Sequence, residues 1–270
     1  MIQWRNTEVA QTADERPLTA RSVIASTLLG TSPPRLPGWL LVRAGALFGI
    51  AEGTVRTALS RMVAAGELTA DDGTYALAGP LLARQARQDE SRRAAVVAAD
   101  WDGAWTMAVV HGDPRSAAQR SELRAAAGAL RLAELREGVW VRPDNLDPDR
   151  LPASSAVLAT QCARLTVHPD EPGPEDLASR LWELDGWAAR AAALRARMDG
   201  IVVALEAGDT AALAPGFVLS ASVLRLTQAD PLLPDALLPA AWPGAALRAE
   251  YDRYDAAYQS LLRAWFRAQR

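Results

Sequence analysis

The sequence predicts a multidomain α+β protein with an N-terminal winged helix-turn-helix, a central ferredoxin-like α+β domain and a C-terminal, mainly helical domain. The run 45–77 has the order helix, tight turn, amphipathic helix and β-hairpin, which is typical of a winged helix-turn-helix. Strand and helix patterns then alternate, and long helical patterns follow them. The expected parts are a flexible tail at 1–16, the winged helix-turn-helix at 17–93, the central domain at 94–170 and the helical domain at 171–270.

Capping residues and helix breakers predict the first two helices of the N-terminal region, called the head below. Thr19 is a good N-cap and Gly30 a good terminator, so a helix is expected between them. Its inward side chains would be Val23, Ile24, Thr27 and Leu28. The prolines of 32–37 predict a loop. A second helix is expected at 39–48, and Gly49 begins the turn after it.

The third helix, 52–65, has the clearest periodicity. Its apolar face consists of Val55, Leu59, Met62 and Val63. The opposite face is small and poor in acids: Gly53, Thr54, Thr57, Ser60 and Arg61, with Arg56 on the flank. A solvated face is the ordinary interpretation. A helix that enters the major groove of DNA, however, needs small residues for close approach and a few long donors, and this face fits that need.

A β-hairpin is expected after Gly66. Segments 67–70 and 74–77 flank Asp72-Gly73, a strong two-residue turn signal. A linker helix then carries Arg84, Arg87, Arg92 and Arg93. Solvent exposure is the ordinary interpretation of these arginines, and secondary contact with DNA phosphates is the alternative.

The central region predicts a β-α-β-β order, which is typical of a ferredoxin-like domain. A helix is expected at 114–132, and the strands are expected at 106–111, 136–142, 156–160 and 164–168.

The C-terminal region is predicted to be mainly helical. A loop at 169–174 precedes a helical stretch at 176–206, with Gly186 and Gly200 as candidate breaks. The segment 215–243 is dense in proline, and a final amphipathic helix is expected at 245–267.

Composition limits the class of protein. The 270 residues suffice for two or three domains. The sequence contains no apolar run of about 18 residues, and its N-terminus has no apolar signal-peptide core. A cytoplasmic location without a membrane span is therefore expected. The single cysteine, Cys162, excludes an internal disulfide and is expected to be a small buried hydrophobe.

Charge is unevenly distributed. The net charge is −3, and every cationic side chain other than histidine is an arginine. Residues 1–95 contain 11 Arg against 9 Asp and Glu, whereas residues 96–270 contain 18 against 23. An acidic body with a mildly basic head argues against a non-specific DNA coat. Phosphate contacts would come from planar, bidentate guanidinium groups.

Six blocks of sequence occur together in one order. They are ARSVIASTLLG (20–30), LFGIAEGTVRTALSRMVAAGEL (47–68), DGAWTMAVVHG (102–112), LREGVWVRPDNL (135–146), LWELDGW (181–187) and DPLLPDALLPAAWPG (230–244). With these blocks the chain resembles the PaaX family of bacterial repressors of phenylacetic acid catabolism and related regulators. The resemblance covers nearly the whole chain.

The resemblance implies a homodimeric repressor whose central domain looks like the small nuclease of CRISPR adaptation. It implies release from an imperfect palindromic operator by an aryl-coenzyme A thioester such as phenylacetyl-CoA. The DNA-contact residues that it implies are Thr54, Arg56, Thr57, Ser60 and Arg61. The sequence departs from the family at Ala51, where a hydroxyl residue is usual, and at the acidic hairpin tip 69–73.

The effector site is not identified by the sequence. Arg120, Arg124 and Arg131 lie along one expected helix and could hold phosphates, although ordinary solvated arginines would look the same. The tryptophans could line an aromatic pocket, and core packing is the alternative: Trp101, Trp105, Trp140, Trp182, Trp187, Trp242 and Trp265.

Two other function classes remain open. A metal-dependent nuclease would need an acidic residue at a strand end, and Asp113 is the obvious candidate. His111 and His168 have no ligand spacing, and common catalytic and nucleotide-binding motifs are missing. The other class is an interaction adaptor whose winged helix binds no DNA. No catalytic residue, metal or cofactor is expected.

Overall fold

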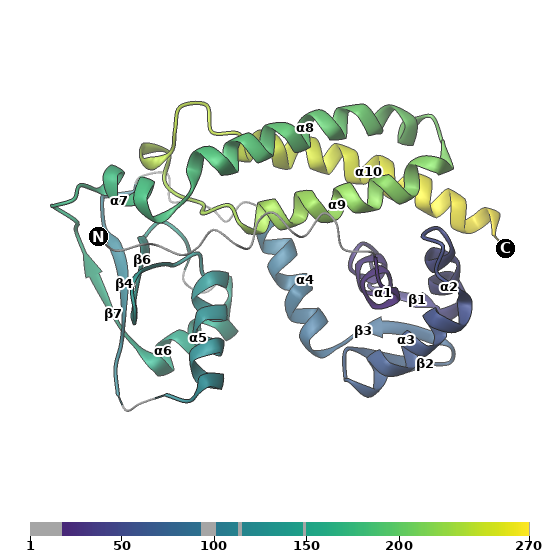
Figure 1. Ribbon diagram of the computed structural model, residues 1–270, viewed down its shortest axis with the longest axis horizontal. Helices are drawn as coiled ribbons and strands as arrows, with labels where there is room; N and C mark the ends of the chain where they lie inside the picture. The colour runs from purple at the N-terminus through teal and green to yellow at the C-terminus, as the bar shows by residue number, and fades with distance from the viewer. Residues whose placement is uncertain (1–17, 93–100, 113–114, 148–149, 270) are drawn as a thin grey trace. The chain divides into compact units, whose positions relative to one another are not determined.

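The computed structural model describes residues 18–92, 101–112, 115–147 and 150–269 (Figure 1). The expected tail, 1–16, lies outside them. The chain divides into two compact units. Unit 1 contains the chain up to Ala86 together with 197–223 and 251–270, and unit 2 contains 87–196 and 224–250.

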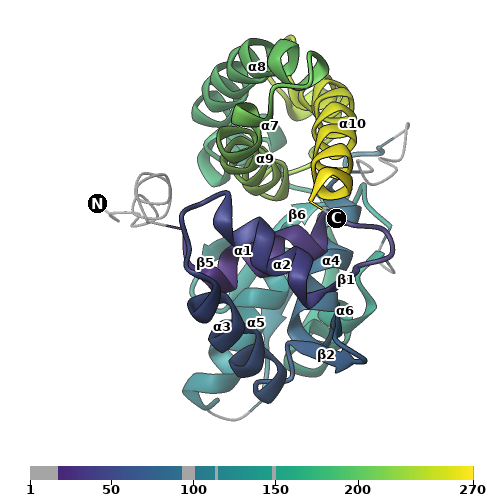
Figure 2. The same ribbon diagram turned by 90° about the vertical axis from the view of Figure 1, so that its right-hand side faces the viewer.

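Three helices and a small sheet form the head, the N-terminal part of unit 1 (Figures 1 and 2). The elements are α1 (Ala20–Leu29), β1 (Arg35–Pro37), α2 (Gly38–Ala46), α3 (Glu52–Ala64), β2 (Leu68–Asp71) and β3 (Thr74–Leu77). Thr19 and Ser22 form a capping box, and Gly30 is the C-cap, so the predicted first helix is confirmed. The four side chains expected to face inward from it are buried.

The sheet has the antiparallel order β1-β3-β2. Asp72 and Gly73 both have positive φ, 43° and 71°, as a tight two-residue hairpin requires, and the predicted hairpin is confirmed. The loop expected at 32–37 is wrong in its second half, because β1 pairs there with β3. Proline lacks an N–H but is tolerated on an edge strand, so the sequence signal for a loop did not exclude pairing.

Helices α2 and α3 lie close together at Gly45. A Cβ atom built on Gly45 would lie 2.5 Å from Cγ2 of Val55, the most deeply buried residue of α3. Gly49, at φ +68°, then reverses the chain between the two helices. The crossing of α2 and α3 therefore depends on the missing side chain at position 45.

Replacing Gly45 with alanine should lower the free energy of unfolding by about 1–3 kcal/mol, because Val55 is stiff at χ1 and cannot easily move aside. Gly53→Ala is the matched control. No atom lies within 4 Å of a Cβ there, so alanine should be neutral or stabilise the helix by about 0.5–1 kcal/mol. Urea denaturation of both variants measures the difference. Equal stability of the two variants would contradict the close approach.

The C-terminal segments of unit 1 come from three long helices: α8 (Leu184–Glu206), α9 (Leu213–Gln228) and α10 (Gly244–Ala268). The hydroxyl of Tyr254 donates to the carbonyl of Gly216 at 2.7 Å, and Arg253 pairs with Glu206 at 3.1 Å. The ring of Phe48 lies 4.8 Å from that of Phe217. The head is thus anchored within its unit by aromatic packing.

Unit 2 is built on a four-stranded antiparallel sheet with the order β5-β6-β4-β7. Its elements are β4 (Trp105–Val110), α5 (Ala117–Ala129), β5 (Ala133–Arg136), β6 (Val139–Pro143), α6 (Pro152–Gln161) and β7 (Cys162–Val167). This β-α-β-β-α-β order is the split βαβ arrangement. Helices α5 and α6 lie beside this sheet (Figure 1), and Ala108, Trp140 and Leu158 belong to one core cluster of the unit. Trp105 and Val141 face a second core cluster that contains Leu233.

Two local predictions were wrong in this unit. The strand expected at 156–160 is part of α6, which begins with Pro152 in its first turn and packs against α5. A short apolar run fits a helix as well as a strand until its neighbours are known. The strand expected at 136–142 is two strands, because Gly138 at φ +78° turns the chain between β5 and β6.

The remaining elements are α4 (Gly79–Arg92), α7 (Pro174–Leu181), the 3-10 turns η2 (Thr210–Ala212) and η3 (Asp235–Leu237), and the parts of α8, α9 and α10 that belong to unit 2. Neither predicted glycine breaks α8, which continues through Gly186 and Gly200. The chain bends before α8 instead. By length and composition alone, 210–228 could cross a membrane, with a mean hydropathy of 1.3, and 44% of its most apolar 18-residue window is buried.

Arg142 joins two of the sequence blocks within unit 2. Its guanidinium is buried and donates to the carbonyls of Pro143, Leu130 and Leu232 at 2.9, 3.1 and 3.2 Å. It also donates to Oδ1 of Asn145 at 2.8 Å, and Asn145 itself donates to the Leu232 carbonyl. The LREGVWVRPDNL and DPLLP blocks are therefore held together by hydrogen bonds.

Candidate nucleic-acid interface

The exposed face of α3 is the candidate interface. Val55, Leu59 and Met62 are buried beneath it, and Val63 is half-buried. All five predicted DNA-contact residues are exposed: Thr54, Arg56, Thr57, Ser60 and Arg61. The amphipathic pattern placed both faces of this helix correctly, because a single apolar stripe fixes which side of a helix faces the core.

The N-terminus of α3 is uncapped, as expected. Ala51 is in extended conformation and makes no side-chain cap hydrogen bond. Glu52 supplies a negative charge in the first turn, where the helix dipole favours it. The carboxylate of Glu52 also accepts from Nε of Arg56 at 2.7 Å. One predicted contact arginine is therefore engaged within its own helix.

The remaining residues of the face differ in whether their side chains already make hydrogen bonds within the protein. Thr57 donates its hydroxyl to the Gly53 carbonyl at 2.8 Å, and Ser60 donates to the Arg56 carbonyl at 3.2 Å. Among the residues that the structure describes, Thr54 and Arg61 have no hydrogen-bond or ion-pair partner. Arg61 can therefore bind an external acceptor without breaking a hydrogen bond or ion pair with any described residue.

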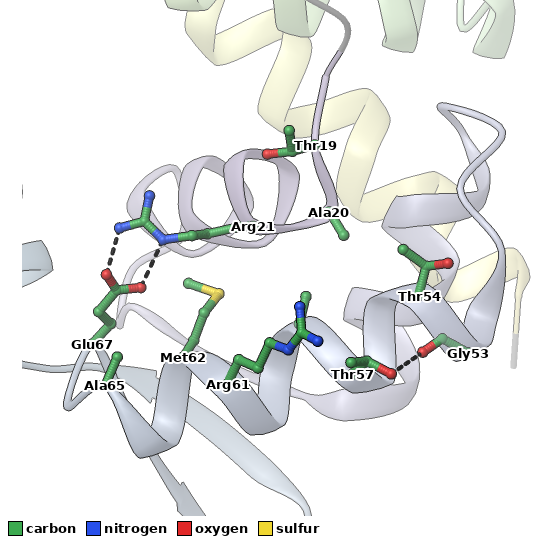
Figure 3. Close-up of a pocket in the computed structure, with 11 residues that line it drawn as sticks. Thr19, Ala20, Arg21, Gly53, Thr54, Thr57, Arg61, Met62, Ala65 and Glu67 are labelled. Atoms are coloured by element: carbon green, nitrogen blue, oxygen red, sulfur yellow. Dashed lines mark hydrogen bonds and ion pairs between the residues drawn. The ribbon is translucent and has the colours of Figure 1, made fainter.

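A groove of about 590 Å³ lies between α1 and α3. Figure 3 shows Thr54, Thr57 and Arg61 coming from α3, Arg21 from α1 and Thr19 from the N-cap position before α1. The full lining is Thr19, Ala20, Arg21, Gly53, Thr54, Thr57, Ala58, Arg61, Met62, Ala65 and Glu67. Three of the five predicted residues are thus brought to one groove, whereas Arg56 and Ser60 are not part of it.

Arg21 closes one end of this groove. Its Nε donates to Glu67 at 2.9 Å and its Nη2 donates to the other carboxylate oxygen (Figure 3). This bidentate pair raises the pKa of Arg21 and lowers the pKa of Glu67, chiefly through the hydrogen bond. Sequence reasoning missed Arg21 as a groove residue. Its place in the first turn of α1, on the side away from Val23 and Ile24, was the available signal.

The hairpin tip carries exposed acids, Asp71 and Asp72. Their charge would repel a phosphate backbone. Of the linker arginines, Arg87 is exposed, and the side chains of Arg92 and Arg93 lie outside the described residues. The groove beside α3 contributes two arginines, Arg21 and Arg61.

Features of a metal-dependent nuclease do not come together in the part of the chain that the structure describes. No group of three or more His, Cys, Asp or Glu there could hold a metal ion. The nuclease candidate Asp113 lies outside the described residues. His111 and His168 are exposed on the surface. Cys162 is buried as expected, and burial raises the pKa of its thiol.

Several tryptophans of unit 2 are buried or stacked and serve as packing groups. Trp105, Trp140 and Trp187 are buried. The Trp187 ring stacks on Trp242 at 4.5 Å, and its indole N–H donates to the Leu226 carbonyl at 2.9 Å. These contacts support the core-packing interpretation for this part of unit 2.

Comparison with known proteins identifies the family. Three domain models match, described as PaaX-like protein at residues 19–80, PaaX protein central Cas2-like domain at 98–167 and PaaX-like protein C-terminal domain at 182–268. The chain belongs to the PaaX family. PaaX-family proteins are regulators of phenylacetate catabolism, so a regulatory role is supported, and the matched domains are of the regulatory rather than the enzymatic type.

A solved structure described as the uncharacterized protein Rv0674 from Mycobacterium tuberculosis is similar to this PaaX-family chain. The two are 41% identical, the match covers 91% of this chain and 98% of that chain, and the TM-score is 0.66. No curated protein matches the sequence.

Proposed function

We propose that this protein is a cytoplasmic transcriptional repressor of a catabolic operon and that it binds double-stranded DNA through α3. In this proposal the head, within 17–93, is a winged helix-turn-helix and α3 is its recognition helix. One observation carries the proposal: α3 presents an exposed, acid-poor face of small residues on which Arg61 has no partner among the described residues. Arginine is the side chain that most often makes bidentate contacts with guanine in the major groove.

The groove beside α3 suits a DNA backbone. When α3 enters the major groove, Arg61 and Thr54 are directed at base edges or the nearest phosphate, and Arg21 lies across the groove from them (Figure 3). The acidic hairpin tip contributes little phosphate binding. Recognition then rests on Thr54, Arg56, Thr57, Ser60 and Arg61.

The protein is proposed to act as a homodimer. Two recognition helices would enter successive major grooves about 34 Å apart and bind an imperfect palindrome. The central domain at 94–170 and the helical domain at 171–270 would carry the effector response. An aryl-coenzyme A thioester such as phenylacetyl-CoA is proposed as effector on the basis of family membership. A coupling free energy of about 1–3 kcal/mol would suffice to release the DNA.

Binding of the full-length protein to the DNA upstream of its own gene tests this proposal. Fluorescence anisotropy is measured over a series of salt concentrations, with and without phenylacetyl-CoA, and with scrambled DNA of equal length as the control. We expect sequence-selective binding whose affinity falls as salt rises and which the thioester weakens at least about fivefold. Equal affinity for scrambled DNA at every salt concentration would overturn the proposal.

A further inference from the structure

A cavity of about 480 Å³ in unit 2 is not used by the proposed DNA interface. It is bounded by α4, α5 and α6. Its lining residues are Arg87, Glu90, Glu122, Ala125, Ala126, Gly128, Ala129, Arg131, Ala153, Ser154, Val157 and Gln228. Half of these residues are small or apolar and half are charged or polar, and small-molecule sites likewise combine an apolar wall with placed polar groups.

Arg131 is a buried cation with an unused donor. Its side chain is only 8% exposed, and its Nε has no hydrogen-bond partner in the structure. The contact of its Nη2 with Glu90 is long, at 3.4 Å. A buried donor without a partner is costly, so this position favours a ligand that supplies an acceptor. Arg120 and Arg124, predicted as possible phosphate contacts on the same helix, are exposed instead.

The charges around Arg131 favour an anion. Glu90 makes its short contact, 2.8 Å, with Arg150, so the one nearly buried carboxylate here is shared between two arginines. The guanidinium of Arg142 is also buried and uses neutral acceptors only. Asp230, the other buried acid of this unit, pairs with Arg248 at 2.8 Å. Two arginines and two glutamates line the cavity itself, and Arg142 and Arg150 are further cations near Arg131, so cations exceed anions around Arg131.

The backbone conformation of Arg131 also indicates that this arginine has a role other than ending the helix. Arg131 follows the last turn of α5 with φ at +64°, a conformation that usually takes glycine. An arginine there costs roughly 1–2 kcal/mol relative to glycine. The chain therefore has an arginine at a position where glycine would make the better helix end.

We propose that this cavity binds a small molecule through an oxyanion, phosphate or carboxylate, that accepts a hydrogen bond from the guanidinium of Arg131. Arg87, which is exposed, meets the ligand at the mouth, and Ala125, Ala129 and Val157 contact its uncharged part. The ligand draws Arg131 away from Glu90. Since Glu90 lies on α4, which follows β3 of the head directly in the chain, this loosens one contact of the connecting helix. The assignment of this ligand as the effector rests on the proposed function.

Calorimetric titration of the full-length protein without DNA tests the site. Three probes separate the possible sources of the oxyanion: inorganic pyrophosphate, ADP and benzoate. Arg131→Gly removes the guanidinium and suits the positive φ, so the variant should fold at least as well as the natural protein. Arg124→Ala removes an exposed arginine of α5 and is the control for the change in net charge.

We expect at least one probe to bind the natural protein and Arg124→Ala equally well, and to bind Arg131→Gly at least about tenfold more weakly. Unchanged thermal stability of Arg131→Gly shows that the fold is retained. Equal affinity of Arg131→Gly and the natural protein, or no binding of any probe, would overturn the site.

The coupling is tested separately with the upstream DNA. The bound probe should lower DNA affinity of the natural protein at least about fivefold and leave that of Arg131→Gly unchanged. An equal response of both proteins would overturn the role of Arg131. Failure of the proposed function would look different, because neither protein would select the upstream DNA while the calorimetric result would stand.

Discussion

Replacing Arg61 with alanine should weaken binding of the protein to its upstream DNA by about 5- to 150-fold, corresponding to about 1–3 kcal/mol. Arg61 is exposed on α3 and has no partner within the described residues, so its guanidinium is free to bind base edges or phosphate. Arg56 is engaged by Glu52, and Arg56→Ala should therefore cause a smaller loss than Arg61→Ala.

Anisotropy titrations at two salt concentrations measure both effects. Arg180→Ala, an exposed position on α7, removes the same charge from unit 2 and should leave the affinity unchanged. A reduced salt dependence of Arg61→Ala would indicate a lost phosphate contact, whereas relaxed sequence preference would indicate a lost base contact. Natural affinity in Arg61→Ala would show that the exposed face of α3 is not the interface.

Replacing Arg142 with methionine should lower the free energy of unfolding by about 2–5 kcal/mol. The buried guanidinium is the donor to three carbonyls and to Asn145, and an unsatisfied buried polar group costs about 1–3 kcal/mol. An opposing effect is present, because burial and the nearby charges of Arg150 and Arg131 lower the pKa of Arg142. Without Arg142, the carbonyls and the Asn145 side chain would lose their hydrogen-bond donor. We expect the free-energy cost of that loss to exceed the gain from removing a buried, repelled charge.

Urea denaturation followed by tryptophan fluorescence measures this change, since Trp105 and Trp140 lie in the same unit. Arg136→Met, at an exposed position of β5, is the control and should change stability by less than about 0.5 kcal/mol. A more stable Arg142→Met would mean that desolvation and repulsion outweigh the hydrogen bonds. It would also show that the hydrogen bond from Arg142 to the Leu232 carbonyl of the DPLLP block does not stabilise the fold.

Local signals predicted much of the head. The capping box of Thr19 and Ser22, the Asp72-Gly73 turn and the apolar stripe of α3 act within a few residues of chain. Their outcome therefore depends little on the rest of the fold. The exposed positions of the five predicted contact residues follow from the same periodicity, although their binding to DNA stays a prediction.

Partners distant in the chain decided the rest. The edge strand β1 exists because β3 lies beside it, and 152–161 is helical because it packs on α5. The groove depends on Arg21 and Glu67, which are 46 positions apart. No local pattern could reveal that pairing.

The sequence by itself determined the family, the first helix and the hairpin of the head, and the exposed face of α3, because periodicity, caps and turn residues are local and short-range in their energetics. Only the tertiary structure decided which arginines are used and which are available. Four arginines that look alike in the sequence differ in the structure. Arg56 is paired with Glu52, and Arg61 has no partner among the described residues. Arg131 is buried with an unused Nε, whereas each guanidinium nitrogen of the buried Arg142 donates a hydrogen bond. Burial and the positions of distant acceptors set that difference, since the cost of a charge depends on what surrounds it.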